Sequence, residues 1–219
     1  MKNLFSTSIG KKFAMAISAI FLMIFLLQHF IINITSVFSE DIFNMLSHFM
    51  GTNFLVQFIL QPILIAGVLF HFIMGFYLEI QNRKAAKYEY QKEKGSANST
   101  WMSRNMITSG LVILAFLVLH FIDFWVPEMN YKYIEFLPED PNRYYEELVH
   151  KFENPLRVAM YCISFVLLAL HLLHGFTSSL RSMGTNKSYV SSAKTAGIVY
   201  SIGIPLGFCV IAIFHYLNH

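Results

Sequence analysis

The feature that most constrains this chain is a series of five long stretches that contain no charged residue. They run from 13 to 39, 42 to 78, 105 to 122, 158 to 180 and 195 to 219. Each can hold the ~20 predominantly apolar residues that cross a bilayer as a helix. Charged residues make up only 13% of the chain, whereas soluble domains carry about 25%. The sequence therefore predicts an all-α integral membrane protein, a bundle of five transmembrane helices.

The apolar stretches also set the expected boundaries of the helices. We place them at about 13–36, 54–80, 104–126, 156–181 and 194–217. Together they form a single membrane domain, residues 1–219, with a long outer connection at 127–155. Within that connection, residues 144–152 have the mixed pattern of a short surface helix. We expect the first helix to be retained, because it is too long for a secretory signal and no small-residue cleavage site closes it.

Lysine and arginine residues are concentrated on one side of the predicted bundle. Twelve of the sixteen lie in the N-terminal segment and in the second and fourth connections. The positive-inside rule then places the N-terminus in the cytoplasm, and five spans place the C-terminus outside. The basic connection at 81–103 is a topology determinant, a docking surface for a cytoplasmic partner, or both, since the same charges serve either purpose.

Each of the first four predicted helices has a histidine well inside it, at His29, His71, His120 and His171. At about 1.5 Å of rise per residue, His29 and His120 lie roughly 24–26 Å above the cytoplasmic charges. His71 and His171 lie roughly 15–18 Å above them, so the two levels differ by about 8–10 Å. We therefore expect an outer pair, His29 with His120, and an inner pair, His71 with His171.

Two histidine pairs at two depths match the ligands of two stacked haems. Two axial imidazoles leave no open position on the iron, so such haems transfer electrons and do not activate oxygen. The chain has no C-x-x-C-H motif, which excludes covalent haem attachment. A lone membrane histidine is more often a hydrogen-bonding or proton-relay group, and the paired arrangement is what favours ligation.

Both inner histidines are followed four residues later by a glycine, Gly75 and Gly175. Residues four apart share a helix face, and a missing side chain there lets a flat macrocycle lie against the backbone. The alternative for either glycine is helix–helix packing through small residues. His174 is the main rival of His171 in the fourth helix, and the shared His-x-x-x-Gly spacing favours His171.

Quinone chemistry needs groups that exchange protons, and the outer connections supply three candidates. Glu40, Asp41 and His48 lie near the level of the outer histidines, where a carboxylate or an imidazole can exchange such protons. The alternative is a solvated loop without chemistry. His215, near the outer end of the last helix, is expected at the membrane interface and is not a favoured ligand.

The ordered set of motifs resembles one known family. The set comprises Gln28-His29, Ser47-His48-Phe49-Met50, His71-x-x-x-Gly75, His120 and His171-x-x-x-Gly175. It is similar to the single-chain, five-helix, di-haem cytochrome b anchors of succinate dehydrogenase and quinol:fumarate reductase. The resemblance covers nearly the whole chain. It implies two haem b groups, menaquinone as the membrane carrier and a bacterial cytoplasmic membrane as the location.

The same resemblance implies partner subunits and excludes nucleic acid as a partner. A flavoprotein subunit would hold FAD and the dicarboxylate site, and an iron–sulfur subunit would dock on the cytoplasmic face; a dimer of such complexes stays open. This chain has no glycine-rich nucleotide loop and no cysteine cluster, so it is expected to be inert toward succinate or fumarate alone. Some quinol:fumarate members carry a proton-conducting glutamate two residues before the fourth haem histidine, where this chain has Ala169.

Two alternatives remain at this point. A proton-coupled transporter with a histidine relay requires membrane carboxylates, and Asp123 is the only acidic residue close to a span interior. A cytochrome b anchor of another quinone-linked dehydrogenase or of a hydrogenase shares the two-haem arrangement without this ordered histidine pattern. A count of b haems per chain separates the transporter from both cytochromes.

Overall fold

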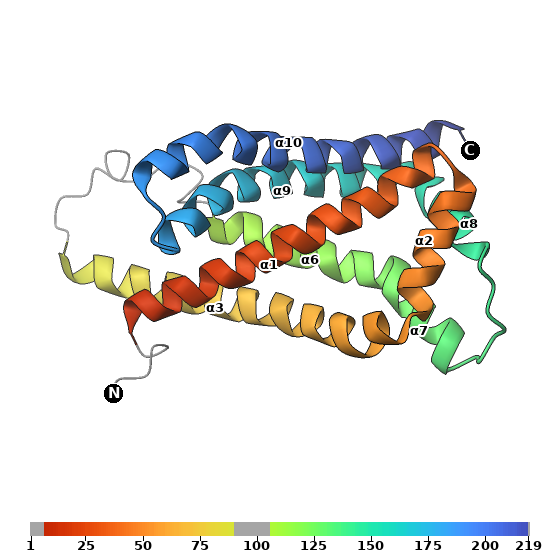
Figure 1. Cartoon of the computed structure of the whole chain (residues 1–219), viewed down its shortest axis with the longest axis horizontal. Coiled ribbons are helices and arrows are strands. Elements are labelled where there is room, and N and C mark those ends of the chain that lie inside the picture. Colours follow the sequence, from red (N-terminus) through yellow and green to blue (C-terminus); the bar gives the residue numbers. More distant parts are fainter. Residues whose placement is uncertain (1–6, 90–105, 219) are drawn as a thin grey trace.

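The computed structural model describes residues 7–89 and 106–218, and these contain no β-strand. Five helical segments are long and apolar enough to span a membrane: Ser8–Val37, Val56–Lys84, Met106–Tyr133, Pro155–Ser182 and Ser192–Asn218. They run alongside one another, and the two termini lie at opposite ends of the bundle (Figure 1). The prediction of an all-α bundle with five candidate spans is thus confirmed.

Several helices extend beyond the predicted ends. α1 (Ser8–Ile34) starts earlier than residue 13, because Thr7 caps it: its hydroxyl accepts the Gly10 N–H at 3.0 Å. α3 (Gln61–Glu89), preceded by the π-helical turn Val56–Leu60, continues past residue 80. Its last residues are polar but favour helix. Hydropathy marks where a helix leaves the apolar layer, and not where the helix ends.

The third span differs most from its expected boundaries. It consists of α6 (Met106–His120), a π-helical turn at Phe121–Trp125 and α7 (Val126–Tyr133). α7 therefore occupies the beginning of the connection predicted at 127–155. The π-helical turn holds one extra residue per turn, and Asp123, which lies in it, is buried.

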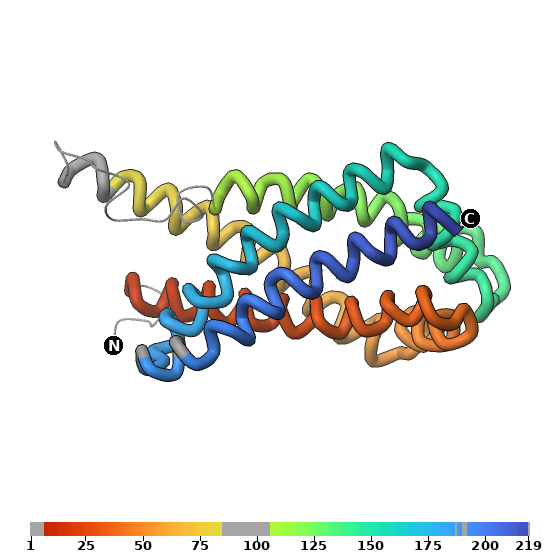
Figure 2. Tube along the Cα trace, turned by 90° about the horizontal axis from the view of Figure 1, so that it is seen from above, coloured from red at the N-terminus to blue at the C-terminus, as the bar shows by residue number. Residues whose placement is uncertain are grey.

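The last two spans form the most tightly packed part of the bundle. α9 (Pro155–Ser182) contacts α1, α6 and α10 (Lys187–Asn218), and runs between α6 and α10 in the view of Figure 2. At Gly207, a β-carbon would collide with the Phe30 ring of α1, so glycine is what allows this approach. Tyr200 also joins α10 to α1 by donating its hydroxyl to the Met23 carbonyl at 2.5 Å.

Two short helices cap the end of the bundle at which α10 finishes. α2 (Glu40–Thr52) lies across the ends of the spans, and α8 (Arg143–Phe152) packs against it (Figure 1). The short surface helix predicted at 144–152 is confirmed by α8. The apolar core under this cap includes Phe43, Leu148, Phe152, Tyr161, Phe165, Ile204, Phe208 and Ile211.

His215 is covered by residues at the capped end of the bundle. This side chain is fully buried, and its Nε2 lies 2.9 Å from the Ser36 hydroxyl, with the ring against Tyr145 at 5.5 Å between centroids. Its expected depth at the membrane interface stays a prediction, and the structure adds that protein covers the side chain. The helices of the cap cover this end of α10, and sequence periodicity alone gave no sign of that cover.

Candidate functional site

The structure brings the two inner histidines together. His71 on α3 and His171 on α9 have their ring centroids 6.4 Å apart, with an angle of 66° between the ring planes. The Nδ1 atom of His71 lies 3.0 Å from the Ser18 hydroxyl of α1, and that of His171 lies 3.2 Å from the Ser109 hydroxyl of α6. Each inner ring is therefore held by a serine from a neighbouring helix.

The two outer histidines are also neighbours. His29 on α1 and His120 at the end of α6 have their centroids 5.8 Å apart, and their planes are nearly perpendicular, at 87°. Their environment is aromatic: Phe25 and Phe208 flank His29, and Phe116, Phe124 and Tyr161 flank His120. The outer pair therefore lies in an apolar, aromatic environment.

These spacings suit a metal ion between the rings of each pair. A metal–imidazole bond is about 2 Å long, and the ring centre lies about 1 Å beyond the nitrogen, so two opposed ligands have centroids about 6 Å apart. The observed values are 5.8 Å and 6.4 Å. Among the described residues, none of the four Nε2 atoms has a hydrogen-bond partner, and the Nδ1 atom of His120 is buried without one. The spacing of the two ring pairs is compatible with imidazoles opposed across a metal ion, and haem ligation stays a prediction.

The two levels are further apart than the sequence arithmetic predicted. Ser18 contacts His71, and His29 lies eleven residues beyond Ser18 on the same helix, which corresponds to about 16 Å of helical rise. The predicted offset of about 8–10 Å is too small. That estimate assumed that Lys12 and Arg83 lie at the same depth. In the structure, Lys11 Nζ donates to the Tyr77 hydroxyl at 2.8 Å, so the start of α1 lies level with a residue six positions before Arg83.

The two glycines beside the inner pair are not required by contacts between helices. A β-carbon at Gly75 would lie 3.5 Å from the Met15 methyl group, and one at Gly175 would lie 3.8 Å from the Met106 methyl group. Both are ordinary van der Waals contacts. A role in admitting a flat group beside the backbone therefore stays a prediction for both positions.

His171, and not its rival, forms the inner pair with His71. His174 lies three residues on, and within the described residues its ring contacts no other histidine. This geometry agrees with the choice made from the His-x-x-x-Gly spacing. The ligand role itself stays a prediction.

A buried ion pair lies next to the outer histidines. Asp123 is 3% exposed; its carboxylate accepts the Tyr161 hydroxyl at 2.8 Å and lies 3.1 Å from the Arg157 guanidinium. The Tyr161 ring in turn contacts His120, with 6.3 Å between centroids. Sequence reasoning singled out Asp123 but not its partners. An aspartate in an apolar span requires a cationic partner. Arg157, near the start of the next span, is the residue from which the sequence could have predicted that partner.

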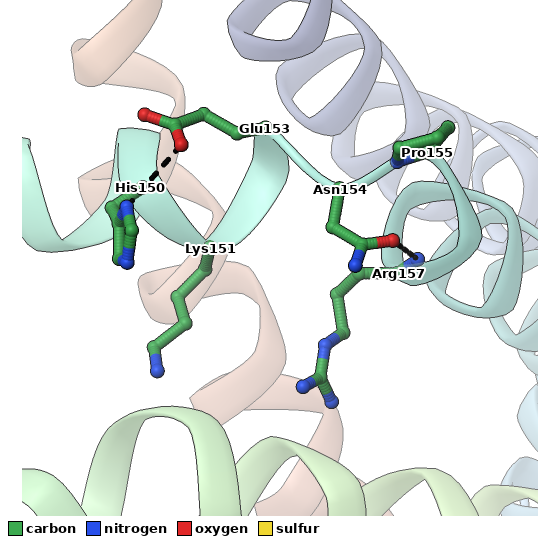
Figure 3. Close-up of a pocket in the computed structure, with 6 residues that line it drawn as sticks. All are labelled: His150, Lys151, Glu153, Asn154, Pro155 and Arg157. Atoms are coloured by element: carbon green, nitrogen blue, oxygen red, sulfur yellow. Dashed lines mark hydrogen bonds and ion pairs between the residues drawn. The ribbon is translucent and has the colours of Figure 1, made fainter.

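Arg157 also reaches a surface pocket of about 550 Å³ at the start of α9. Figure 3 shows its lining, with His150 paired to Glu153 at 3.3 Å and the Asn154 side chain accepting the Arg157 backbone N–H at 3.3 Å. Asn154 thereby caps α9 at its N-terminus. Arg157 is thus shared by the lining of this pocket and the ion pair with Asp123.

A second pocket, of about 250 Å³, lies under the cap and contains one of the quinone candidates. His48 lines it, together with Gln57, Tyr131, Lys132, Arg143 and Tyr144. The Nδ1 atom of His48 is buried without a hydrogen-bond partner in the described part of the chain. Glu40 and Asp41 do not line this pocket; they are exposed in the first turn of α2. Of the three candidates, only His48 faces a cavity.

Charged groups hold this second pocket together. Glu128 pairs with Arg143 and Lys132, and Arg143 also binds Glu147 at 2.6 Å. Burial lowers the pKa of Arg143, but its hydrogen bonds to Glu128 and Glu147 outweigh this, so the net pKa is raised and the guanidinium stays charged. Burial, reinforced by Glu128, raises the pKa of Tyr144 to about 12, so its hydroxyl stays protonated at neutral pH.

No group of three or more histidine, cysteine, aspartate or glutamate residues that could hold a metal occurs in the described residues. Four of the histidines form two ring pairs, His29 with His120 and His71 with His171. Comparisons with protein-family models, with curated proteins and with solved structures found no match for this chain. No relative therefore identifies it as a cytochrome b subunit of succinate dehydrogenase.

Proposed function

We propose that this chain is the di-haem cytochrome b membrane anchor of a succinate:quinone oxidoreductase. One observation carries the proposal: four histidines from four different spans form two ring pairs, 5.8 Å and 6.4 Å between centroids, at two depths of an apolar bundle. His29 and His120 would hold the outer haem, and His71 and His171 the inner one. Haem b bound in this way supplies one-electron transfer and no open coordination position.

The chain's own residues have defined tasks in this scheme. The histidines fix the position and depth of each haem, and the serines Ser18 and Ser109 orient the inner rings. The aromatic shell of the outer pair excludes water, which lowers the local dielectric constant and limits reorganisation on electron transfer. The offset of about 16 Å between the levels suits a relay across the bilayer.

Quinone protons would be exchanged at the outer end. The pocket under the cap offers the His48 imidazole, the Tyr144 hydroxyl and the nearby guanidinium of Arg143. An imidazole can accept or donate a proton, and a hydroxyl and a guanidinium donate hydrogen bonds to a quinone carbonyl. Menaquinone is the carrier that the family resemblance implies. Glu40 and Asp41 have less support, because they lie outside the pocket.

The cytoplasmic partners would dock at the opposite end, where the basic residues are concentrated. We expect an iron–sulfur subunit there, with a flavoprotein subunit holding FAD behind it, in a bacterial cytoplasmic membrane. Lys11, Lys12 and Arg181 belong to this basic side, whereas residues 90–105 of the basic connection lie outside the described residues. The N-terminus would be cytoplasmic and the C-terminus outside, as the lysine and arginine distribution predicts.

The proposal is tested in the intact complex by comparing two activities. His71→Ala should abolish quinone-linked succinate oxidation, because the electron path to the outer level is interrupted. Dye-linked succinate oxidation by the soluble subunits should persist at its original rate. Undiminished quinone-linked turnover in an assembled complex shown to lack the inner haem would contradict the relay.

A further inference from the structure

Each inner histidine meets a serine whose hydrogen-bond role is fixed by a second contact. The Ser18 hydroxyl lies 2.8 Å from the Met15 carbonyl oxygen, and the Ser109 hydroxyl lies 2.9 Å from the Met106 carbonyl oxygen. A carbonyl can only accept, so each hydroxyl donates its single hydrogen to the backbone. Toward the histidine, each serine oxygen is therefore an acceptor.

The consequence for the histidines concerns their tautomer. If Ser18 accepts from His71, the hydrogen of the neutral ring is on Nδ1, and the same holds for Ser109 and His171. In a neutral imidazole only one nitrogen carries hydrogen, so Nε2 keeps its lone pair. That is the atom and the protonation state that a metal ligand requires.

We propose that Ser18 and Ser109 are positioning residues that fix the tautomer and the ring orientation of the two inner haem ligands. The inference rests on the proposed function. Under this inference, α1 and α6 each supply one outer histidine and also position one inner histidine. Neither serine would touch the iron; both act through the imidazoles that they hold.

The sequence repeats this arrangement. Met15, Ser18 and His29 on the first span are spaced as Met106, Ser109 and His120 are on the third. The eleven residues from serine to histidine make about three helical turns, so both side chains lie on one face of the helix. On each of these spans, the outer histidine and the serine that contacts an inner histidine therefore face the interior of the bundle on the same side of the helix.

The outer histidines lack this support. The Nδ1 atom of His120 is buried with no hydrogen-bond partner in the described residues, and that of His29 lies 3.4 Å from the amide nitrogen of Asn33 on its own helix. Removal of either serine should therefore affect the inner haem alone. The outer haem is an internal control.

The charge on the iron determines whether removal of a serine makes the inner haem easier or harder to reduce. A hydrogen bond from Nδ1–H to an oxygen makes the imidazole more electron-rich and a stronger ligand, which favours the oxidised, more positive iron. Loss of the serine oxygen removes this preference. The inner haem should then be reduced more easily, with a change of about fivefold in its oxidised-to-reduced ratio at fixed ambient potential, as expected for one hydrogen bond.

The experiment is a potentiometric titration of the visible haem spectrum, with a haem count, on the full chain in its complex. Ser18→Ala and Ser109→Ala are compared with Ser18→Thr, which keeps the hydroxyl, and with Ser164→Ala. Ser164 is a matched control: a buried serine of α9 whose hydroxyl, among the described residues, binds the Met160 carbonyl alone, at 2.8 Å. The inner signal is identified as the one missing in His71→Ala.

We expect both alanine variants to shift the inner haem signal toward easier reduction or to lose that haem. The outer haem signal should stay as in the wild type. Ser18→Thr and Ser164→Ala should show two haems with wild-type potentials. Two haems with wild-type potentials in both alanine variants would overturn the inference. So would equal shifts in both haems or in Ser164→Ala, which indicate a general packing effect. A wild-type chain without haem would instead refute the proposed function, and this inference with it.

Discussion

At the scale of single residues, the decisive observation is that four histidines distant in sequence meet as two pairs. The sequence allowed this pairing to be predicted, because a histidine in an apolar span is rare and its depth can be counted. It did not reveal Ser18 and Ser109, because a serine in a membrane helix usually bonds to its own backbone. The repeated Met-x-x-Ser spacing before His29 and His120 was the signal that could have identified them.

The choice between two histidines of α9 is tested by substituting each. His171→Ala should remove one of two haems, because His71 loses its opposite ligand, whereas His174→Ala should keep both. The measurement is the haem b content per chain, with the outer haem signal as the reference. Retention of both haems in His171→Ala, with loss in His174→Ala, would overturn the assignment.

The buried carboxylate of Asp123 is expected to stabilise the outer half of the bundle. Asp123→Ala leaves the Arg157 guanidinium and the Tyr161 hydroxyl without their partner, which should lower the free energy of unfolding by about 1–3 kcal/mol. Thermal unfolding in detergent measures this. Glu79→Ala, which breaks the exposed pair with Arg83, should cost less than about 1 kcal/mol. An equally small effect at Asp123 would mean that the buried pair contributes no stability.

At the scale of helices, hydropathy predicted where the five spans lie, and local chemistry decided where they end. α2 was missed because it has few charges and lies beside a span in one uncharged stretch, although Ser39 followed by Glu40 and Asp41 is a helix-start signal. Ser39 does cap α2 by accepting the Ile42 N–H at 3.3 Å. His215 is buried against Ser36 and the Tyr145 ring of α8, and the sequence pattern did not indicate these contacts.

The helix faces beside the inner pair lead to a prediction about glycine. Gly75→Leu and Gly175→Leu place a side chain on the face shared with each inner histidine, where the added β-carbon itself meets only a methionine methyl group. Both should reduce the inner haem content if those faces carry the macrocycle. Gly203→Leu on α10, where nothing lies within 4 Å of an added β-carbon, is the control. Full haem content in both variants would show that neither glycine is needed to make room for the haem.

At the scale of the whole molecule, the structure is an apolar bundle with one capped end and termini on opposite sides (Figure 1). The lysine and arginine distribution predicts which end faces the cytoplasm, and the cap then lies outside with its His48 pocket. Electron entry at the basic end and quinone chemistry at the capped end would use both haem levels in series. Under the proposed function, the dicarboxylate chemistry would come from partner subunits.

The central claim is that this chain binds two haems through four histidines. The most direct measurement is a reduced-minus-oxidised spectrum of the purified chain or complex, with the haem quantified as its pyridine haemochrome. We predict two b haems per chain, reduced to one in His71→Ala. A wild-type chain that contains no haem b, although it is folded and supplied with haem, would contradict the claim.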